Sequence, residues 1–253
     1  MESVFGRLRL YNAVLGVVHL VQAGATLALS NDFSLPVTGS YLQAAPGQAP
    51  PGEPVVEFDL RVGPLVAVFL LLAAADHLLV SAPGLYDWYV RNLRRGVNYA
   101  RWYEYSLSAS LMIVLIAAIT GIADIAALLA IFGANAAMIL FGLVMERHNL
   151  TTERTDWTAF VFGSLVGIAP WVAIVVYVAG AEENAAGEGV PTFVYGIIAS
   201  LFVLFFSFAV NMWLQYRKVG PWRDYLFGEK GYIVLSLVAK SALAWQMFAN
   251  TLV

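Results

Sequence analysis

The sequence predicts an all-α membrane protein, in which seven membrane-spanning helices form one bundle and the first outer loop forms a small β-hairpin. Two observations predict this fold class. The 253-residue chain is 60% hydrophobic and 12% charged, with a mean hydropathy of +0.73, whereas soluble domains average about 45–50% apolar and about 25% charged residues. Seven stretches are also long and apolar enough to span a bilayer, which takes about 20 residues each. Residues 1–253 are therefore expected to form a single membrane domain.

The composition also argues against several classes of function. The chain has no cysteine, which excludes disulfides, thiolate metal sites and cysteine nucleophiles. A net charge of −3 without a basic patch argues against nucleic acid as a partner. The sequence pairs no nucleophile with a base and shows no cluster of metal ligands, so neither an enzyme nor a metal site is predicted.

The seven spans are expected to be helices, because lipid offers backbone polar groups no other partner. They cover residues 9–30, 62–82, 99–120, 122–145, 157–180, 191–216 and 229–251. The N-terminal segment lacks the pattern of a cleavable signal, so its apolar run is taken as the first span. The stretch from 100 to 145 is too long for one span, and Thr120, Gly121 and Asp124 indicate a tight turn within it.

The basic residues predict how the bundle is oriented. Eleven of the fourteen lysines and arginines fall on one side of the predicted bundle, Arg61 alone falls on the other, and Arg101 and Lys240 lie inside spans. Because positive residues accumulate in cytoplasmic loops, we expect the N-terminus in the cytoplasm and the C-terminus outside the cell membrane. The eleven are Arg7, Arg9, Arg91, Arg94, Arg95, Arg147, Arg154, Arg217, Lys218, Arg223 and Lys230.

The first outer loop, residues 31–61, is the longest connection and holds five of the ten prolines. Loops of this length usually carry function or structure of their own. The alternation in VVEFDLRV favours a strand, and SLPVTGSYL can pair with it. We expect a hairpin that covers the outer mouth of the bundle or meets a partner subunit. A disordered linker is the alternative.

Lys240 is the single charge in the apolar stretch VLSLVAKSALAWQMF of the last span. A charge at the bilayer centre costs roughly 2.5–3.5 kcal/mol on insertion scales and therefore points to function. Lys240 lies near the middle of its span, too deep for its ammonium to reach the headgroups by snorkelling. It either forms a structural ion pair or anchors a carbonyl ligand as a Schiff base. A lysine at this place in the last of seven helices is the arrangement of retinal proteins.

Glu104 is the expected partner of Lys240, because it is the only acid of the third span before the turn. Ser236 lies one turn before Lys240 and Ser108 one turn after Glu104, so both hydroxyls face the same buried site. Arg101 precedes Glu104 by three residues, and a helical salt bridge between them is the alternative. We favour the pairing with Lys240, because Arg101 can reach the cytoplasmic interface and Lys240 cannot.

Polar residues of the first two spans fall in the half of the bundle that is predicted to be cytoplasmic. Histidine titrates near neutral pH, so a polar cluster there can hold or pass a proton. The expected cluster comprises His19, Gln22, His77, Arg101, Glu104 and Ser236. The alternative is that the two histidines separately bind helices together. Asp76 precedes His77 but points about 100° away on the helix, toward a different neighbour.

Aromatic and small residues indicate where a flat ligand fits. Pro170 inside the fifth span predicts a kink that turns Trp171 inward, and Phe206 belongs to the many aromatic residues of the last three spans. Small residues in IFGANAAMILFG, residues 131–142, allow close approach of helices or leave room for a flat ligand.

Long motifs throughout the chain resemble the heliorhodopsins. The resemblance is carried by NDFSLPVTGSYL, RWYEYSLSASLMIVLIA, GIADIAALLAIFGANAAMILFG, PTFVYGIIASLF and GYIVLSLVAKSALAWQ. It implies seven helices that bind all-trans retinal as a protonated Schiff base, here at Lys240. It also implies an orientation inverted from other microbial rhodopsins, which agrees with the distribution of basic residues.

The resemblance also assigns roles to individual polar residues. Glu104 matches the single counterion of the family. His19, His77 and Ser236 match its polar cluster on the cytoplasmic side. Asp76 departs from the apolar residue expected at its position, which leaves the hydrogen bonding near His77 open.

Further residues are expected to contact the retinal. Asn135 and Met138 match positions beside it in the family, and we add Ser108, Trp171 and Phe206 to the expected contacts. The family forms homodimers in which the first outer loop takes part, so a second copy is the expected partner.

Two functions are compatible with this arrangement. The first is a light sensor, in which retinal isomerises from all-trans to 13-cis and acts on an unidentified cytoplasmic or membrane signalling partner. The alternative is a light-driven proton pump or channel. A pump needs proton donors and acceptors on both sides of the linkage, yet the outer half of the third span has no carboxylate. Ser236 also occupies the position where light-driven proton pumps carry an aspartate, so the sensor is favoured.

Overall fold

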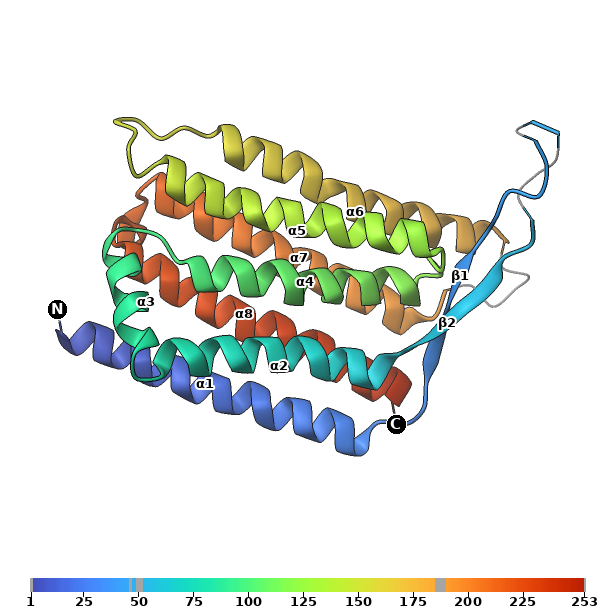
Figure 1. The fold of residues 1–253 in the computed structure, drawn as a ribbon, viewed down its shortest axis with the longest axis horizontal. Helices are drawn as coiled ribbons and strands as arrows, with labels where there is room; N and C mark the ends of the chain where they lie inside the picture. The colour runs from blue at the N-terminus through green and yellow to red at the C-terminus, as the bar shows by residue number, and fades with distance from the viewer. Residues whose placement is uncertain (1, 46, 49–51, 185–189, 253) are drawn as a thin grey trace.

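A computed structural model of the protein describes all residues except 1, 46, 49–51, 185–189 and 253. Within the described residues, seven helices are long and apolar enough to cross a membrane, as the sequence predicts (Figure 1). They are α1 (Glu2–Leu29), α2 (Val62–Ser81), α4 (Tyr99–Ile119), α5 (Ile125–His148), α6 (Thr158–Asn184), α7 (Thr192–Tyr216) and α8 (Tyr225–Met247). A 3₁₀ turn, Gly220–Arg223, precedes α8, and a π-helical turn, Phe248–Leu252, follows it.

Most helices begin and end within a few residues of their predicted bounds. The first is the main exception, because α1 starts at Glu2, several residues before the apolar run that predicted it. The last helix also starts early, at Tyr225. Asp224 fixes this start by accepting a hydrogen bond from Leu226 N at 3.0 Å, which satisfies one of the free N–H groups of the first turn.

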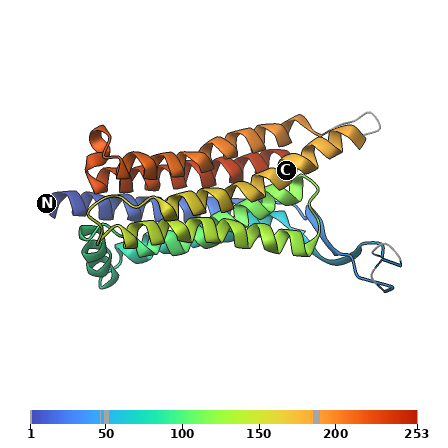
Figure 2. The same ribbon diagram turned by 90° about the horizontal axis from the view of Figure 1, so that it is seen from above.

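The helices pack into a bundle whose two ends differ. α1 packs on α2, α2 on α4, α4 on α5, α5 on α6, and α7 on α8. The N-terminus and the hairpin lie at opposite ends of this bundle (Figure 2). We call the end at which α1 begins the arginine-rich end, because it carries Arg91, Arg94, Arg147, Arg217 and Arg223. The opposite end is called the hairpin end.

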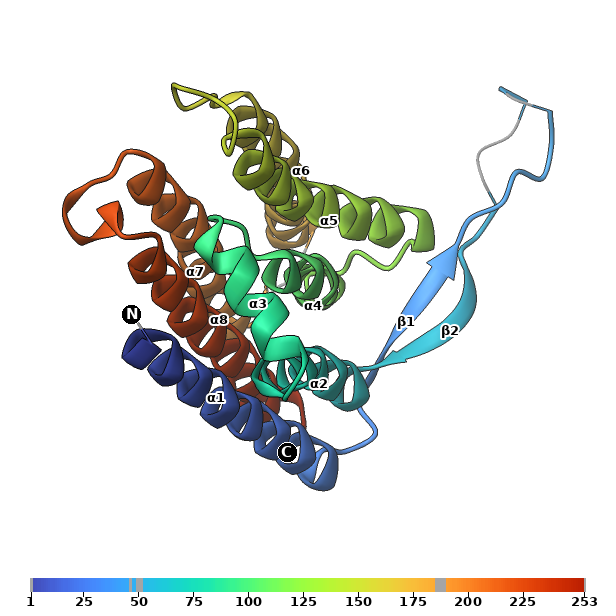
Figure 3. The same cartoon turned by 60° about the vertical axis from the view of Figure 1, so that its left-hand side comes forward.

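The arginine-rich end contains one helix that the sequence analysis missed. α3 (Leu85–Arg94) lies across this end of the bundle (Figure 3). Its Tyr89, Val90 and Leu93 are buried against α1, α2 and α8. Its exposed residues include the charged Asp87, Arg91 and Arg94 together with Leu85 and Trp88. A helix this short and polar is not detected by a search for apolar spans, although its amphipathic pattern was present in the sequence.

The predicted hairpin is confirmed. β1 (Ser34–Gly39) pairs with β2 (Val55–Arg61) in an antiparallel two-stranded sheet, with an irregularity of register between Val37 and Thr38. Tyr41, just beyond β1, donates a hydrogen bond to Glu57 at 2.6 Å and ties the two arms together. A disordered linker is therefore the wrong description of the two strand segments.

The tight turn between α4 and α5 is also present and anchors the hairpin. Gly121 has a φ of +95°, a conformation that glycine adopts without strain. Asp124 caps α5 by accepting a hydrogen bond from Ala127 N at 2.9 Å. Thr38 N of β1 donates to Ala123 O at 2.8 Å. The turn thus holds the hairpin against the end of the bundle.

Candidate functional site

Lys240 projects from α8 into the bundle, and only 3% of the residue is exposed. Its Nζ donates a hydrogen bond to Ser236 Oγ at 2.8 Å and lies 3.3 Å from both carboxylate oxygens of Glu104. Ser236 comes from the preceding turn of the same helix, while α4 supplies Glu104. A buried ammonium is stable only when such partners replace its hydration. The structure therefore brings together the three residues that the sequence predicted to meet.

The first turn of α4 sets the position of Glu104. Asn98 caps the helix by accepting a hydrogen bond from Arg101 N at 3.1 Å. Glu104, in the second turn, is 8% exposed and faces Lys240. Ser108 follows one turn later and is fully buried, and its Oγ has no hydrogen-bond partner among the described residues. Of the two predicted hydroxyls, only that of Ser236 contacts Lys240.

Arg101 pairs with two carboxylates that the sequence analysis did not assign to it. Its guanidinium lies 2.5 Å from Glu146 and also contacts Glu229, and only 3% of the residue is exposed. The alternative salt bridge to Glu104 is not formed, and the expectation that Arg101 reaches the cytoplasmic interface is wrong. The planar guanidinium presents donors in two directions, which suits one carboxylate from α5 and one from α8.

These charges form a network that we call the Arg101 cluster: Asn98, Arg101, Trp102, Glu146 and Glu229. Glu146 accepts hydrogen bonds from Asn98 N at 3.0 Å and from Trp102 Nε1 at 2.6 Å. Asn98 Nδ2 donates to Glu229 at 2.8 Å. The sequence contained an indication of this network: Glu146 directly follows the end of one predicted span, and Glu229 is the first residue of another. Both therefore fall at the same end of the bundle as Arg101.

His19 and His77 meet, as the sequence predicted. Their rings stack with centroids 5.8 Å apart and planes within 4° of each other, and both side chains are buried. His77 Nδ1 lies 2.7 Å from Asn12 Oδ1. Neither ring nitrogen of His19 has a hydrogen-bond partner among the described residues. The pair thus joins α1 to α2.

The rest of the predicted polar cluster is more dispersed. Gln22 Oε1 accepts a hydrogen bond at 3.0 Å from the Oγ of Ser241, the residue that directly follows Lys240. Arg101 belongs to the Arg101 cluster, where its ion-pair partners are Glu146 and Glu229 rather than the histidines. Among the described residues, no direct hydrogen bond joins the histidine pair to Glu104 or Lys240.

An apolar cavity of about 240 Å³ lies beside Lys240, bounded by α4, α5, α6, α7 and α8. Trp171 follows Pro170 inside α6 and is 9% exposed, with its ring packed edge-on against Phe202 at 5.2 Å. Phe206 also lines the cavity but is 61% exposed, so it stands at the edge of the bundle. Both aromatic residues singled out by the sequence therefore border this cavity.

Small residues give the cavity its width. Met138 lines it from α5, and a Cβ added at Gly167 of α6 would lie 2.1 Å from Met138 Sδ. A Cβ added at Gly142 would lie 2.4 Å from the ring of Trp102. Asn135, which was expected beside the ligand, does not border the cavity. It is buried instead and donates a hydrogen bond to Ser110 at 3.1 Å.

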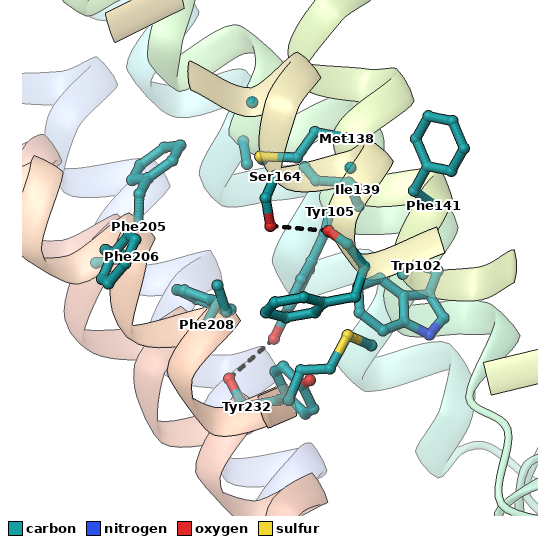
Figure 4. Close-up of a pocket in the computed structure, with 18 of the residues that line it drawn as sticks. Trp102, Tyr105, Met138, Ile139, Phe141, Ser164, Phe205, Phe206, Phe208 and Tyr232 are labelled. Carbon is teal, nitrogen blue, oxygen red and sulfur yellow. Dashed lines mark hydrogen bonds between the residues drawn. The ribbon is translucent and has the colours of Figure 1, made fainter. Parts of the chain in front are cut away.

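Other lining residues were missed by the sequence analysis. Tyr105, Phe208 and Tyr232 surround the end of the cavity near the Arg101 cluster (Figure 4). Tyr105 donates a hydrogen bond to Tyr232 O at 2.9 Å, and its ring centroid lies 4.7 Å from Lys240 Nζ. Tyr105 could have been identified from the sequence, because it directly follows Glu104 and therefore lies close to the ion pair.

The site fits a flat apolar molecule that carries one carbonyl group. The cavity walls are mostly aromatic and aliphatic side chains, and Lys240 supplies the one amine that reaches them among the described residues. An amine in such a setting can condense with a carbonyl group. The carboxylate of Glu104 and the hydroxyl of Ser236 supply polar groups next to that amine. Ser108, which was expected to contact the ligand, is buried without a hydrogen-bond partner in the described part of the chain and does not line the cavity.

The fold is that of the microbial rhodopsins. A solved structure, the light-driven proton pump LR (Mac) from Leptosphaeria maculans, matches with a TM-score of 0.66 and 16% sequence identity, over 96% of this chain and 94% of that chain. At this level of identity the likeness shows the shared fold alone.

The sequence pattern of the heliorhodopsins matches residues 8–252, and the chain therefore belongs to the heliorhodopsin family. No curated protein matches the chain. Membership of this family makes it a multi-pass membrane photoreceptor that uses retinal.

Proposed function

We propose that the protein is a light sensor that transports no ions, with all-trans retinal attached to Lys240 and Glu104 as the counterion. The observation that carries the proposal is the buried contact between Lys240 Nζ and the Glu104 carboxylate at 3.3 Å, beside an apolar cavity. Bound there as a protonated Schiff base, retinal would absorb visible light and isomerise to the 13-cis form.

The residues around Lys240 have separate tasks in this proposal. Glu104 stabilises a positive charge at Nζ, because a buried cation needs a carboxylate close by. Ser236 orients Nζ by its hydrogen bond at 2.8 Å. Tyr105 offers the face of its ring to the same charge at 4.7 Å. Trp171 and Met138 confine the apolar part of the ligand from two sides.

A route for the signal runs through Trp102. Its ring lines the cavity, while its Nε1 donates to Glu146 in the Arg101 cluster. Glu146 also accepts from Tyr225, at the start of α8. A shift of Trp102 would therefore change contacts of α4, α5 and α8 at the arginine-rich end, where a cytoplasmic or membrane signalling partner would bind.

Neutralising Glu104 tests the counterion. We expect Glu104→Gln to move the visible absorption band strongly to longer wavelength, because the ground state loses the charge that stabilises the cation. The exposed Glu57→Gln is the matched control and leaves the band in place. An unchanged spectrum in Glu104→Gln would refute the assignment.

A light-driven proton pump or channel is the second candidate, favoured only by the shared fold with a proton pump. Ser236 replaces the carboxylate that a pump needs one turn before the lysine, and α4 has no acid between Glu104 and its end at Ile119. We expect no light-driven pH change in vesicles that contain the protein. A sustained pH change or photocurrent would support the pump instead.

The orientation and the assembly belong to the same proposal. We infer that the arginine-rich end faces the cytoplasm, with the C-terminus outside the cell, because basic residues concentrate there. We also infer a homodimer in which the hairpin takes part, since Val55, Val56 and Phe58 of β2 are about half exposed. Labelling of each terminus in intact cells and the mass of the purified protein in detergent test these two points.

A further inference from the structure

Asp76 is an acid inside a membrane-spanning helix that the proposed function does not use. It is half-buried near the arginine-rich end of α2. Among the described residues it has no hydrogen-bond or ion-pair partner, unlike the neighbouring His77, which contacts Asn12 at 2.7 Å. An isolated carboxylate inside a bilayer is costly, so its presence requires a physical reason.

Asp76 and Glu104 lie at a similar depth in the bundle. Their helices pack against each other and run in opposite directions. Asp76 lies five residues before Ser81, the last of α2, and Glu104 lies five residues after Tyr99, the first of α4. With a rise of about 1.5 Å per residue, each is about 7.5 Å from its helix end.

Asp76 belongs to a buried stripe of α2. Ala73, three residues before it, and Val80, four residues after it, are 1% and 5% exposed. Its electrostatic neighbours come from the helices on that side rather than from α1. The titratable and charged groups around it are Tyr89 of α3, Arg101 and Glu104 of α4, and Glu229 and Lys240 of α8, while His19 of α1 stacks on His77, the next residue of α2.

We propose that Asp76 and Glu104 share one proton beside Lys240, which makes Asp76 a positioning residue for the charge at Lys240 Nζ. Arg101 is already paired with Glu146 and Glu229, so the one remaining cation of this group is Lys240. Lys240 is itself paired with Glu104. A further carboxylate in a poorly solvated site, with no cation in contact with it, is stable only when protonated.

The proton has a defined place in each state. While Glu104 is paired with the charge at Lys240, the proton stays on an oxygen of Asp76. When that positive charge moves away, the O–H bond at Asp76 breaks and one forms at Glu104, directly or through a water molecule. The negative charge moves the opposite way, so the pair keeps one proton and one negative charge throughout.

The inference rests on the proposed function, and alkaline titration of the visible band in the retinal-loaded protein tests it. We expect the wild type to show a transition to shorter wavelength when Asp76 loses its proton, because a second negative charge stabilises the cation at Lys240. Asp76→Asn lacks this transition and Asp76→Glu restores it. A purely structural Asp76 would leave the titration unchanged in both variants.

A second readout needs no retinal. In the retinal-free protein near neutral pH, the infrared stretch of a protonated carboxylic acid is expected in the wild type and absent in Asp76→Asn. The proposal requires that Asp76→Asn lose both the alkaline transition of the visible band and the infrared band of the protonated acid. If either feature persists in the variant as in the wild type, the proposal is overturned. If the protein forms no visible band at all, the proposed function fails, while the infrared comparison still decides the protonation of Asp76.

Discussion

At the scale of single residues, the buried charges of this protein form two sites with different tasks. Lys240, paired with Glu104, borders an apolar cavity, where a ligand can reach the amine. Arg101, Glu146 and Glu229 are enclosed, and both carboxylates pair with the one guanidinium. The first arrangement suits chemistry with a cofactor, whereas the second holds helix ends together.

The Arg101 cluster predicts a large loss of stability when its cation is removed. Arg101→Met leaves two buried carboxylates without a positive partner, and breaking a buried ion pair in this way costs about 3–5 kcal/mol. Thermal unfolding in detergent measures the effect, with the exposed Arg91→Ala as control. A midpoint within a degree or so of the wild type would contradict the structural role of Arg101.

The width of the cavity predicts the effect of filling it. Gly167→Leu places side-chain atoms where Met138 Sδ now lies, within 2.1 Å of the new Cβ. Overpacking costs about 1–3 kcal/mol, so we expect retinal to bind about tenfold more weakly or worse, as measured by titration of the visible band. Gly133→Leu is the control, because no atom lies within 4 Å of its added Cβ. Equal binding by both variants would argue against this cavity.

Several of these residues could be predicted from the sequence, and the reason differs from case to case. Lys240 and Glu104 were identifiable because charge is rare in the middle of a membrane span. Lys240 is the one charge in the middle of the last span, and Glu104 is the one acid of the third span before the turn. The partners of Arg101 were not assigned, because the choice among three acids depends on which helices are neighbours. Asn135 was placed beside the ligand by resemblance, but its amide turns toward Ser110 instead.

At the scale of elements, the turn between α4 and α5 stabilises the hairpin end of the bundle. Asp124 caps α5 and adjoins the backbone that pairs with β1. Asp124→Ala removes a cap worth about 1 kcal/mol and is expected to lower the unfolding midpoint by a few degrees. The exposed Glu153→Ala should have no such effect. If both variants unfold together with the wild type, the cap does not stabilise the turn.

The connection between α5 and α6 predicts a dependence on pH. Hydrogen bonds from Thr158 hold the pKa of Asp156 below its ordinary value of 3.8, with a smaller contribution from His148. A lowered pKa means that the contacts of Asp156 stabilise this loop fully above about pH 4, and that this stabilisation is lost as the pH falls through the lower, folded value.

Amide hydrogen exchange of residues 149–157 measures this effect. We expect protection to fall on acidification below about pH 4 in the wild type. Asp156→Asn should already be less protected at neutral pH and respond little to acid. The same acid response in the variant as in the wild type would assign the effect to another group.

The elements show what apolar pattern alone can predict. Seven long apolar runs predicted seven helices, and alternation with turn residues predicted the hairpin, because both signals are local. α3 was missed because it is neither apolar nor long, and its order comes from packing on α1 and α8. The early start of α1 is likewise invisible to a hydropathy search, since that segment lies beyond the apolar run.

At the scale of the whole molecule, the fold alone does not separate sensing from pumping. The proton pump from Leptosphaeria maculans shares the fold at 16% identity, so the difference must lie in the placement of carboxylates. This chain has Ser236 in contact with Lys240, and Asp76, which is proposed to share a proton with Glu104, lies toward the arginine-rich end. Both acids proposed to exchange a proton, Glu104 and Asp76, lie toward the arginine-rich end. A proton that moves between them can return to its starting place, which suits a sensor better than a pump.

The central claim is that Lys240 binds retinal covalently, and the colour of the purified protein tests it most directly. After addition of all-trans retinal, the wild type and Lys230→Ala are expected to show a visible absorption band that hydroxylamine bleaches. Lys240→Ala is expected to remain colourless while keeping its helical content. A visible band of equal strength in Lys240→Ala, or its absence in the wild type, would contradict the account.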